Sequence, residues 1–252
     1  MRHLERVDGI GILCAALALA TLAATCGRDT PAEPAAATAP PPAPPPGPEA
    51  VPESLPMGGA KSVTKFFVTS KGGGRGGDLD GLEGADAHCQ KLAKAQGSGD
   101  HIWQAYLSTS ATGTRPGVNA RDRIGKGPWY NAEGSLVAAT VDALHGNGNR
   151  IDKQTAVTEA LDPVNGAGDT PNTHDILTGS RPDGTAFPAG DDRTCANWTS
   201  SGRGAAQVGH HDRQGTGEGA GSWNSAHASR GCSQQALQAT GGAGLFYCFA
   251  ID

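Results

Sequence analysis

The sequence predicts an α+β domain with mostly antiparallel sheets, one or two helices, long glycine-rich loops and two disulfides. Short runs with the two-residue alternation of strands lie between turn residues, and one run has helical periodicity. Glycine makes up 38 of the 252 residues and aromatic residues only 5%, which is typical of a loop-rich domain with a modest core. Cross-links would stabilise such a core, and the chain carries the cysteines to form them.

The first 26 residues have the features of an export signal. Arg2 and Arg6 precede an apolar run of fifteen residues (10–24), which is shorter than the roughly 20 residues of a membrane span. The run ends in "LAATCG", which resembles a bacterial lipobox with Cys26 as the lipidated residue. Thr25 stands where such motifs have Gly, Ala or Ser. We expect a lipoprotein of the bacterial envelope, at the outer membrane or cell surface; simple secretion or an uncleaved anchor are the alternatives.

Residues 27–60 are rich in proline and alanine and have no apolar periodicity. Such a chain buries too little surface to offset its ordering entropy, so we expect a disordered, extended tether of polyproline type. The folded domain is then 61–252. The net charge of −5 gives no electrostatic indication of a nucleic-acid partner.

The domain is expected to contain one main helix, five short strands and long connecting loops. A helix is predicted from Gly84 to the glycines at 97 and 99, because five residues share one face at helical spacing: Ala85, Cys89, Leu92, Ala93 and Gln96. Residues 119–124 form a polar turn or short helix, 127–140 resemble a hairpin, and 201–231 form a long loop with little periodicity. Strands are predicted at 63–70, 102–108, 175–178, 195–200 and 245–251.

A G-x-G-x-x-G pattern lies at Gly72, Gly74 and Gly77, after the first strand. A dinucleotide site needs the helix to begin at the last glycine, but "DLDGLE" intervenes here and places acids where phosphate would lie. We therefore interpret this stretch as a connector. Asp78 and Asp80 could share a calcium ion, although the stretch lacks a full EF-hand loop, and a solvated acidic turn is the simpler reading.

Four cysteines fall in the domain: Cys89, Cys195, Cys232 and Cys248. An even number in an exported domain indicates two disulfides, and the three pairings that four cysteines allow stay open. No pair has C-x-x-C spacing, so a zinc ribbon or thioredoxin-type site is unsupported.

The order of "CQKLAKAQGSGDHIWQAYLSTS", "ARDRI", "DILTGSRPDGTAF", "CANWTS" and "LFYCFAI" resembles the endostatin domain of basement-membrane collagens. Looser glycine-rich relatives on bacterial exported lipoproteins look closer still. The resemblance runs from Phe66 to the C-terminus and implies a C-type-lectin-like fold. It also implies nested disulfides, Cys89 with Cys248 and Cys195 with Cys232.

The resemblance carries over few of the family's binding sites. Lectins hold calcium with a Glu-Pro-Asn or Gln-Pro-Asp turn and a later Trp-Asn-Asp, whereas this chain has "RPD" at 181–183 and "WNS" at 223–225. Arg181 and Ser225 each remove a calcium ligand. The histidine cluster that binds zinc in endostatin is missing, since no histidine lies between His3 and His88. Heparin binding would rest on one short basic segment, Arg115 to Lys126.

The segment "GHHDRQGTGEG" (209–219) is a further candidate. His210, His211, Asp212 and Glu218 offer ligands for a transition metal. Adjacent histidines rarely face one ion, however, and the loop is rich in glycine, so we expect it to be solvated. Asn197 begins an "NWT" glycosylation sequon, which in a bacterial-looking chain we attribute to packing.

We expect a binding module without catalysis, which recognises a glycan or a protein through its 201–231 region. It requires no cofactor, and its only expected membrane contact is the lipid anchor. The alternatives are a structural envelope protein and an exported hydrolase that uses Asp191 or Asp192 with a histidine. Ca²⁺ is the ion we retain as a possible ligand, with Asp78, Asp80, Asp183 and Asn224 as candidate metal ligands. The candidate ligand-binding residues are Asp183, Asn197, Trp198, Trp223 and Asn224.

Overall fold

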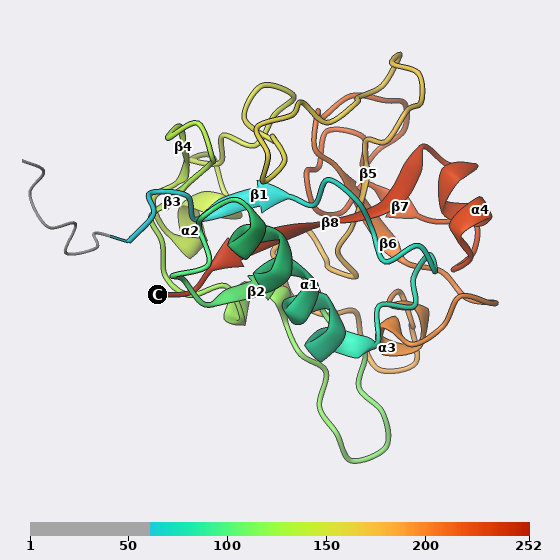
Figure 1. Ribbon diagram of the computed structural model, residues 1–252. Coiled ribbons are helices and arrows are strands. Elements are labelled where there is room, and N and C mark those ends of the chain that lie inside the picture. The colour runs from blue at the N-terminus through green and yellow to red at the C-terminus, as the bar shows by residue number, and fades with distance from the viewer. Residues whose placement is uncertain (1–60) are drawn as a thin grey trace, which may run out of the picture. The chain divides into compact units, whose positions relative to one another are not determined.

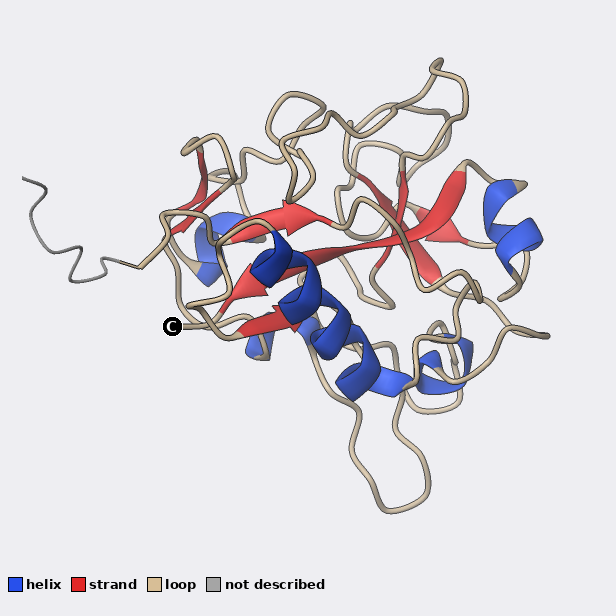
Figure 2. Cartoon of the chain, viewed as in Figure 1, coloured by secondary structure: helices blue, strands red, loops and turns tan. Residues whose placement is uncertain are grey.

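The computed structural model describes residues 61–252. The predicted signal segment (1–26), with Cys26, and the predicted tether (27–60) lie outside the described residues. Within 61–252 the structure is a mixture of α and β with few helices, mostly antiparallel strands and long connecting loops (Figure 2). None of the helices in this part of the chain is long and apolar enough to cross a bilayer.

The main sheet is built around β8 (Gly242–Ala250), the longest strand, which runs through the middle of the domain (Figure 1). β1 (Phe66–Val68) and β2 (Trp103–Ala105) pair with it in antiparallel fashion. β5 (Asp175–Leu177) pairs with it in parallel. The order β1-β8-β5-β6-β7 then continues through two antiparallel strands, β6 (Gln207–His210) and β7 (His227–Ala228).

The remaining elements are short. β3 (Trp129–Tyr130) and β4 (Leu136–Ala138) form the predicted hairpin, with a bulge between Trp129 and Tyr130. A single 3-10 turn, Ala120–Asp122, occupies the predicted polar turn. The helices are α1 (Gly81–Ala95), α2 (Val141–Leu144), α3 (Cys195–Trp198) and α4 (Gln234–Gln238).

The core lies on both faces of β8. Its alternating side chains divide between two clusters: Phe246, Cys248 and Ala250 point to one, and Leu245, Tyr247 and Phe249 point to the other. The first cluster contains the buried face of α1, and the second contains the tryptophans Trp129 and Trp223. A strand that is covered on both faces is continuously apolar, which explains the run "LFYCFA".

α1 confirms the predicted helical face in all but one position. Ala85, Cys89, Leu92 and Ala93 are buried, whereas Gln96 is exposed because the helix ends at Ala95 and Gln96 caps it. The helix begins before Gly84, at Gly81, after Asp80 adopts a left-handed conformation (φ 61°).

Two disulfides join the four cysteines of the domain. Cys89 on α1 bonds to Cys248 on β8, and Cys195 bonds to Cys232, each with Cα atoms 5.7 Å apart. This is the nested pairing that the family resemblance implied. The first bond ties the helix to the central strand, and the second closes the base of the 201–231 region.

Two predicted segments were wrong. The predicted strand at 195–200 is a helical turn with left-handed backbone angles, and the 201–231 segment contains β6 and β7 instead of being a single loop. Strands of two to four residues that include glycine and histidine give no clear alternation, so sequence patterns do not reveal them.

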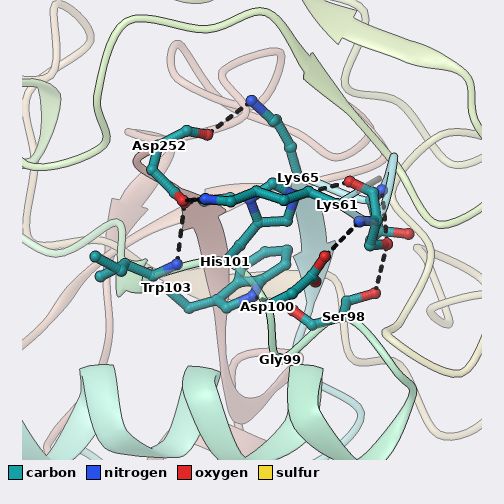
Figure 3. A network of polar contacts seen from close by, with 12 residues as sticks. Lys61, Lys65, Ser98, Gly99, Asp100, His101, Trp103 and Asp252 are labelled. Carbon is teal, nitrogen blue, oxygen red and sulfur yellow. Dashed lines mark hydrogen bonds and ion pairs between the residues drawn. The ribbon is translucent and has the colours of Figure 1, made fainter. Parts of the chain in front are cut away.

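Both ends of the described chain meet in one polar network (Figure 3). Asp252 forms an ion pair with Lys61 and accepts hydrogen bonds from the Lys65 ammonium, at 2.7 Å, and from the Ile102 N–H, at 3.0 Å. The buried His101 lies between them, with Nδ1 3.1 Å from Asp252 and Nε2 2.7 Å from the Ser62 carbonyl. The network fixes the point where residue 61 enters the domain.

Removing either disulfide should destabilise the domain, and the Cys89–Cys248 bond should matter more. The two bonds span 159 and 37 residues. The chain-entropy account therefore predicts losses in unfolding free energy of about 5 and about 4 kcal/mol, respectively. Guanidinium denaturation of the paired Cys→Ser variants would measure both losses. A larger loss for Cys195–Cys232 would contradict this explanation.

Candidate functional site

The residues at the two lectin calcium positions, 181–183 and 223–225, lie close together. Their hydrogen bonds, however, join loops of this protein to one another. Trp223 is in the core, and Asn224 is buried beside it. The Asn224 amide nitrogen donates to the Tyr106 hydroxyl at 2.9 Å and to the carbonyls of Arg181 and Pro182, each at 3.2 Å. Its Oδ1 accepts from the Ser222 hydroxyl at 3.1 Å. The amide is therefore occupied within the protein.

The candidate calcium carboxylates do not gather at one point. Asp183 accepts from the backbone N–H and the hydroxyl of Thr185, at 3.0 and 2.6 Å. Asp78 and Asp80 lie in the turn before α1 and form ion pairs with Arg75, at 3.4 and 2.7 Å. These two aspartates line a hollow of about 190 Å³ together with His88. One cation, Arg75, already forms ion pairs with both aspartates of this turn.

The most unusual backbone of the domain is the turn at 195–198. Four consecutive residues have left-handed φ angles: Cys195 (49°), Ala196 (55°), Asn197 (58°) and Trp198 (66°). The left-handed region costs about 1–2 kcal/mol for each residue other than glycine. Such a turn persists only where tertiary contacts determine it.

Several contacts hold this left-handed turn. The Cys195–Cys232 disulfide fixes its start, and the buried Trp198 fixes its end by donating its indole N–H to the Ser108 carbonyl at 2.8 Å. The Asn197 amide pairs with both backbone groups of Ser110, at 2.7 and 3.2 Å. Asn197 and Trp198, two of the candidate ligand-binding residues, therefore have clear structural roles.

A pocket of about 260 Å³ lies beside the left-handed turn and is lined in part by the long loop that follows β2. The residues that line it come from three segments: Ser110, Ala111, Thr112, Gly190, Asp192, Ala196 and Asn197. Burial alone would raise the pKa of the Asp192 carboxyl, but hydrogen bonds from Thr194 and the Ala196 N–H outweigh it and lower the pKa. The pocket therefore presents a carboxylate, an amide and two hydroxyl groups.

A second cluster lies at one end of β5, β6 and β7. Three imidazole Nε2 atoms surround Oδ1 of Asp175: His174 at 3.3 Å, His210 at 3.2 Å and His227 at 3.4 Å. The sheet register brings them together, since Asp175 is opposite His210, and Val208 of the same strand is opposite His227. The rings of His174 and His210 stack with centroids 4.0 Å apart. This histidine cluster is buried except at His227, whose side chain is 38% exposed.

The cluster contradicts the expectation that 209–219 is a solvated loop. His210 and His211 are buried, and so is Asp212, because β6 and the turn after it pack against the segment before β5. His210 faces the cluster, whereas Nε2 of His211 turns to the Asn165 carbonyl at 3.1 Å. Glu218 is exposed. Sequence reasoning missed His174, Asp175 and His227, because residues so far apart give no spacing motif.

The electrostatics of the cluster depend on Asp175. Burial would raise the pKa of its carboxyl. Imidazoles that direct an N–H group at it would more than offset burial and lower the pKa to about 2, whereas imidazoles that direct a lone pair at it would not. The same contact with Asp175 raises the pKa of His227, against the opposing effect of burial. Among residues 61–252, His174, Asp175 and His210 are the one group of histidines, cysteines and carboxylates with metal-ligand spacing.

Glycine at position 196 should stabilise the protein. The Ala196→Gly variant removes the left-handed penalty of an exposed alanine, which exceeds the added entropy of the unfolded chain, so unfolding free energy should rise by about 0.5–1 kcal/mol. The matched control is Ala87→Gly, exposed in the middle of α1, which should lose about 1 kcal/mol. Urea denaturation measures both. Destabilisation by Ala196→Gly would show that the turn is not left-handed in solution.

No protein-family model matches this sequence, and no curated protein is significantly similar to it. The endostatin-like resemblance is therefore carried by the residues of this chain alone. The left-handed turn with its pocket and the histidine cluster are the two sites from which a function is inferred.

Proposed function

We propose that this protein is an exported, non-catalytic binding module of C-type-lectin-like fold, which recognises a glycan at the pocket beside the left-handed turn. The nested disulfides support the fold, together with the antiparallel pairing of the first and last strands, β1 and β8. Disulfides also indicate an oxidising, extracellular compartment. The domain is displayed on the tether at 27–60 and anchored through Cys26.

The pocket's chemistry carries the proposal. Its polar groups are the carboxylate of Asp192, the amide of Asn197 and the hydroxyls of Ser110 and Thr112. In the described part of the chain, Asp192 Oδ2 accepts only from the Ala196 N–H and the Asn197 amide nitrogen donates only to the Ser110 carbonyl, so each keeps a position for a ligand. Sugars are recognised by such groups, because each hydroxyl of the sugar both donates and accepts a hydrogen bond. The wall formed by the left-handed turn is fixed by a disulfide and a buried tryptophan, so little ordering is needed on binding.

The hydrolase alternative lacks support in the structure. Asp191 accepts from the Arg193 guanidinium at 2.7 Å, and Asp192 accepts from Thr194, Ala196 and Ser110. Within residues 61–252, neither aspartate has a hydrogen bond to a histidine. A general base needs such contact with its partner, so this pair gives no catalytic constellation.

A glycan array probed with the oxidised full-length chain tests the proposal. Thr112→Tyr should abolish binding by filling the pocket, whereas Thr114→Tyr on the same exposed loop should bind as the wild type does, because it does not line the pocket. Binding should persist in chelator, since Asn224 and Asp183 are committed to internal hydrogen bonds.

Other outcomes of the array would contradict the proposal in distinct ways. Binding that chelator abolishes and that Ca²⁺, but not Zn²⁺, restores would move the site to the lectin-like calcium positions. Equal loss in both tyrosine variants would place the site elsewhere on the loop. No binding by the wild type would favour a protein ligand or a structural envelope role.

A further inference from the structure

We propose that His174, Asp175 and His210 bind one divalent transition-metal ion, for which Zn²⁺ is the best match, and that His227 completes the site as its fourth ligand. This site is separate from the glycan pocket, since the two have no residue in common. The inference therefore goes beyond the proposed function and does not depend on it.

The first observation is the hydrogen-bond partner of Nδ1 in each histidine. Nδ1 of His174 lies 3.2 Å from the Asp212 carboxylate, Nδ1 of His210 lies 3.0 Å from the Ala220 carbonyl, and Nδ1 of His227 lies 3.1 Å from the Ala228 carbonyl. All three partners are acceptors, so each Nδ1 carries the proton. A neutral imidazole then presents a lone pair at Nε2, the form in which histidine binds metals.

The second observation is that these lone pairs point at another acceptor. Both carboxylate oxygens of Asp175 and Nε2 of His210 are buried and have no hydrogen-bond partner. Without a cation, lone pairs of three imidazoles converge on a carboxylate, which is unfavourable in a buried site. Protonating the three rings instead would bury up to three positive charges beside two carboxylates, Asp175 and Asp212. A single divalent ion would accept a lone pair from all four atoms at once, the three Nε2 atoms and Asp175 Oδ1.

The third observation is the spacing. Two ligands of a tetrahedral zinc ion, each about 2.0–2.1 Å from the metal, lie about 3.3 Å apart. The three Nε2 atoms lie 3.2–3.4 Å from Asp175 Oδ1. The donor atoms of His174, Asp175 and His210 also lie within 4.8 Å of one another. These Nε2–Oδ1 separations match those between the ligands of a tetrahedral ion. His227 lies outside the group of donor atoms within 4.8 Å, so its half-exposed ring has to move inward to become the fourth ligand.

The donor set selects the metal. Three imidazoles and one carboxylate suit zinc and its neighbours in the first transition row, whereas calcium and magnesium need mainly oxygen ligands. Four protein ligands leave no open position, which is the arrangement of structural zinc sites. His227 lies at the half-exposed rim, on a two-residue strand, and so provides the route by which the ion enters.

The outer contacts match those of known metal centres. A zinc-bound histidine commonly donates its other ring nitrogen to a carboxylate or a backbone carbonyl, as all three histidines do here. Asp212 is itself held by the backbone N–H groups of Ala167 and Gln214, at 2.6 and 3.1 Å. Asp212 is therefore a positioning residue, which fixes the ring of His174.

The test is zinc binding by the full-length oxidised protein after chelator treatment. Titration calorimetry with Zn²⁺ should show one tight ion per chain, and Co²⁺ in its place should give the intense visible absorption of a tetrahedral site. Asp212→Asn, which changes the hydrogen-bond partner of the His174 ring, should weaken zinc binding about 10- to 100-fold, and His210→Gln, which removes a metal ligand, should weaken it more. His88→Gln is the matched control and should bind as the wild type does, because His88 lies on α1 and contacts the Lys71 carbonyl.

The other possible results either support or overturn zinc binding at the histidine cluster. If His210→Gln fails to fold, His227→Gln replaces it, since His227 is half-exposed and its substitution should still weaken zinc binding at least 10-fold. A wild-type protein that takes up no zinc would overturn the proposal and leave a hydrogen-bonded histidine cluster. Unchanged affinity in both His210→Gln and His227→Gln would show that zinc binds elsewhere in the chain.

Discussion

The fold depends on one requirement, that β8 be covered on both faces. Its side chains are apolar at nearly every position, so neither face can be left to solvent. α1 covers one face, and the β3–β4 hairpin together with Trp223 covers the other. The Cys89–Cys248 bond joins the helix to this strand covalently. A core this small would otherwise leave the long loops without a stable base.

The glycine-rich region after residue 200 is organised by closures at its base. The Cys195–Cys232 disulfide closes the outer boundary, and β6 and β7 pair inside it. Inside this disulfide, His210 and His227 flank the 211–226 segment, and both contact Asp175, so the two ends of the segment lie close together. Successive cross-links reduce the conformational freedom of a segment whose composition gives it little core of its own.

The two sites illustrate different uses of unfavourable local structure. At the left-handed turn, backbone strain is offset by a disulfide, a buried indole and a paired amide, and the result is a rigid wall beside a solvent-facing pocket. At the histidine cluster, the unfavourable feature is electrostatic, since buried acceptors face one another. The pocket wall is rigid without a ligand, whereas we propose that the histidine cluster binds a metal ion.

The sequence by itself determined the α+β class, a helix from Gly84 to the glycines at 97 and 99, the hairpin and the apolar last strand, because each depends on periodicity or turn residues within one segment. The start of that helix at Gly81 came only from the structure. The disulfide pairing came from the family resemblance, since four cysteines alone left three pairings open. Only the tertiary structure decided the left-handed turn, which contains no glycine and exists through contacts with Ser108, Ser110 and Cys232. It also decided the histidine cluster, because sheet register joins Asp175, His210 and His227 across three strands, and no local pattern encodes that register.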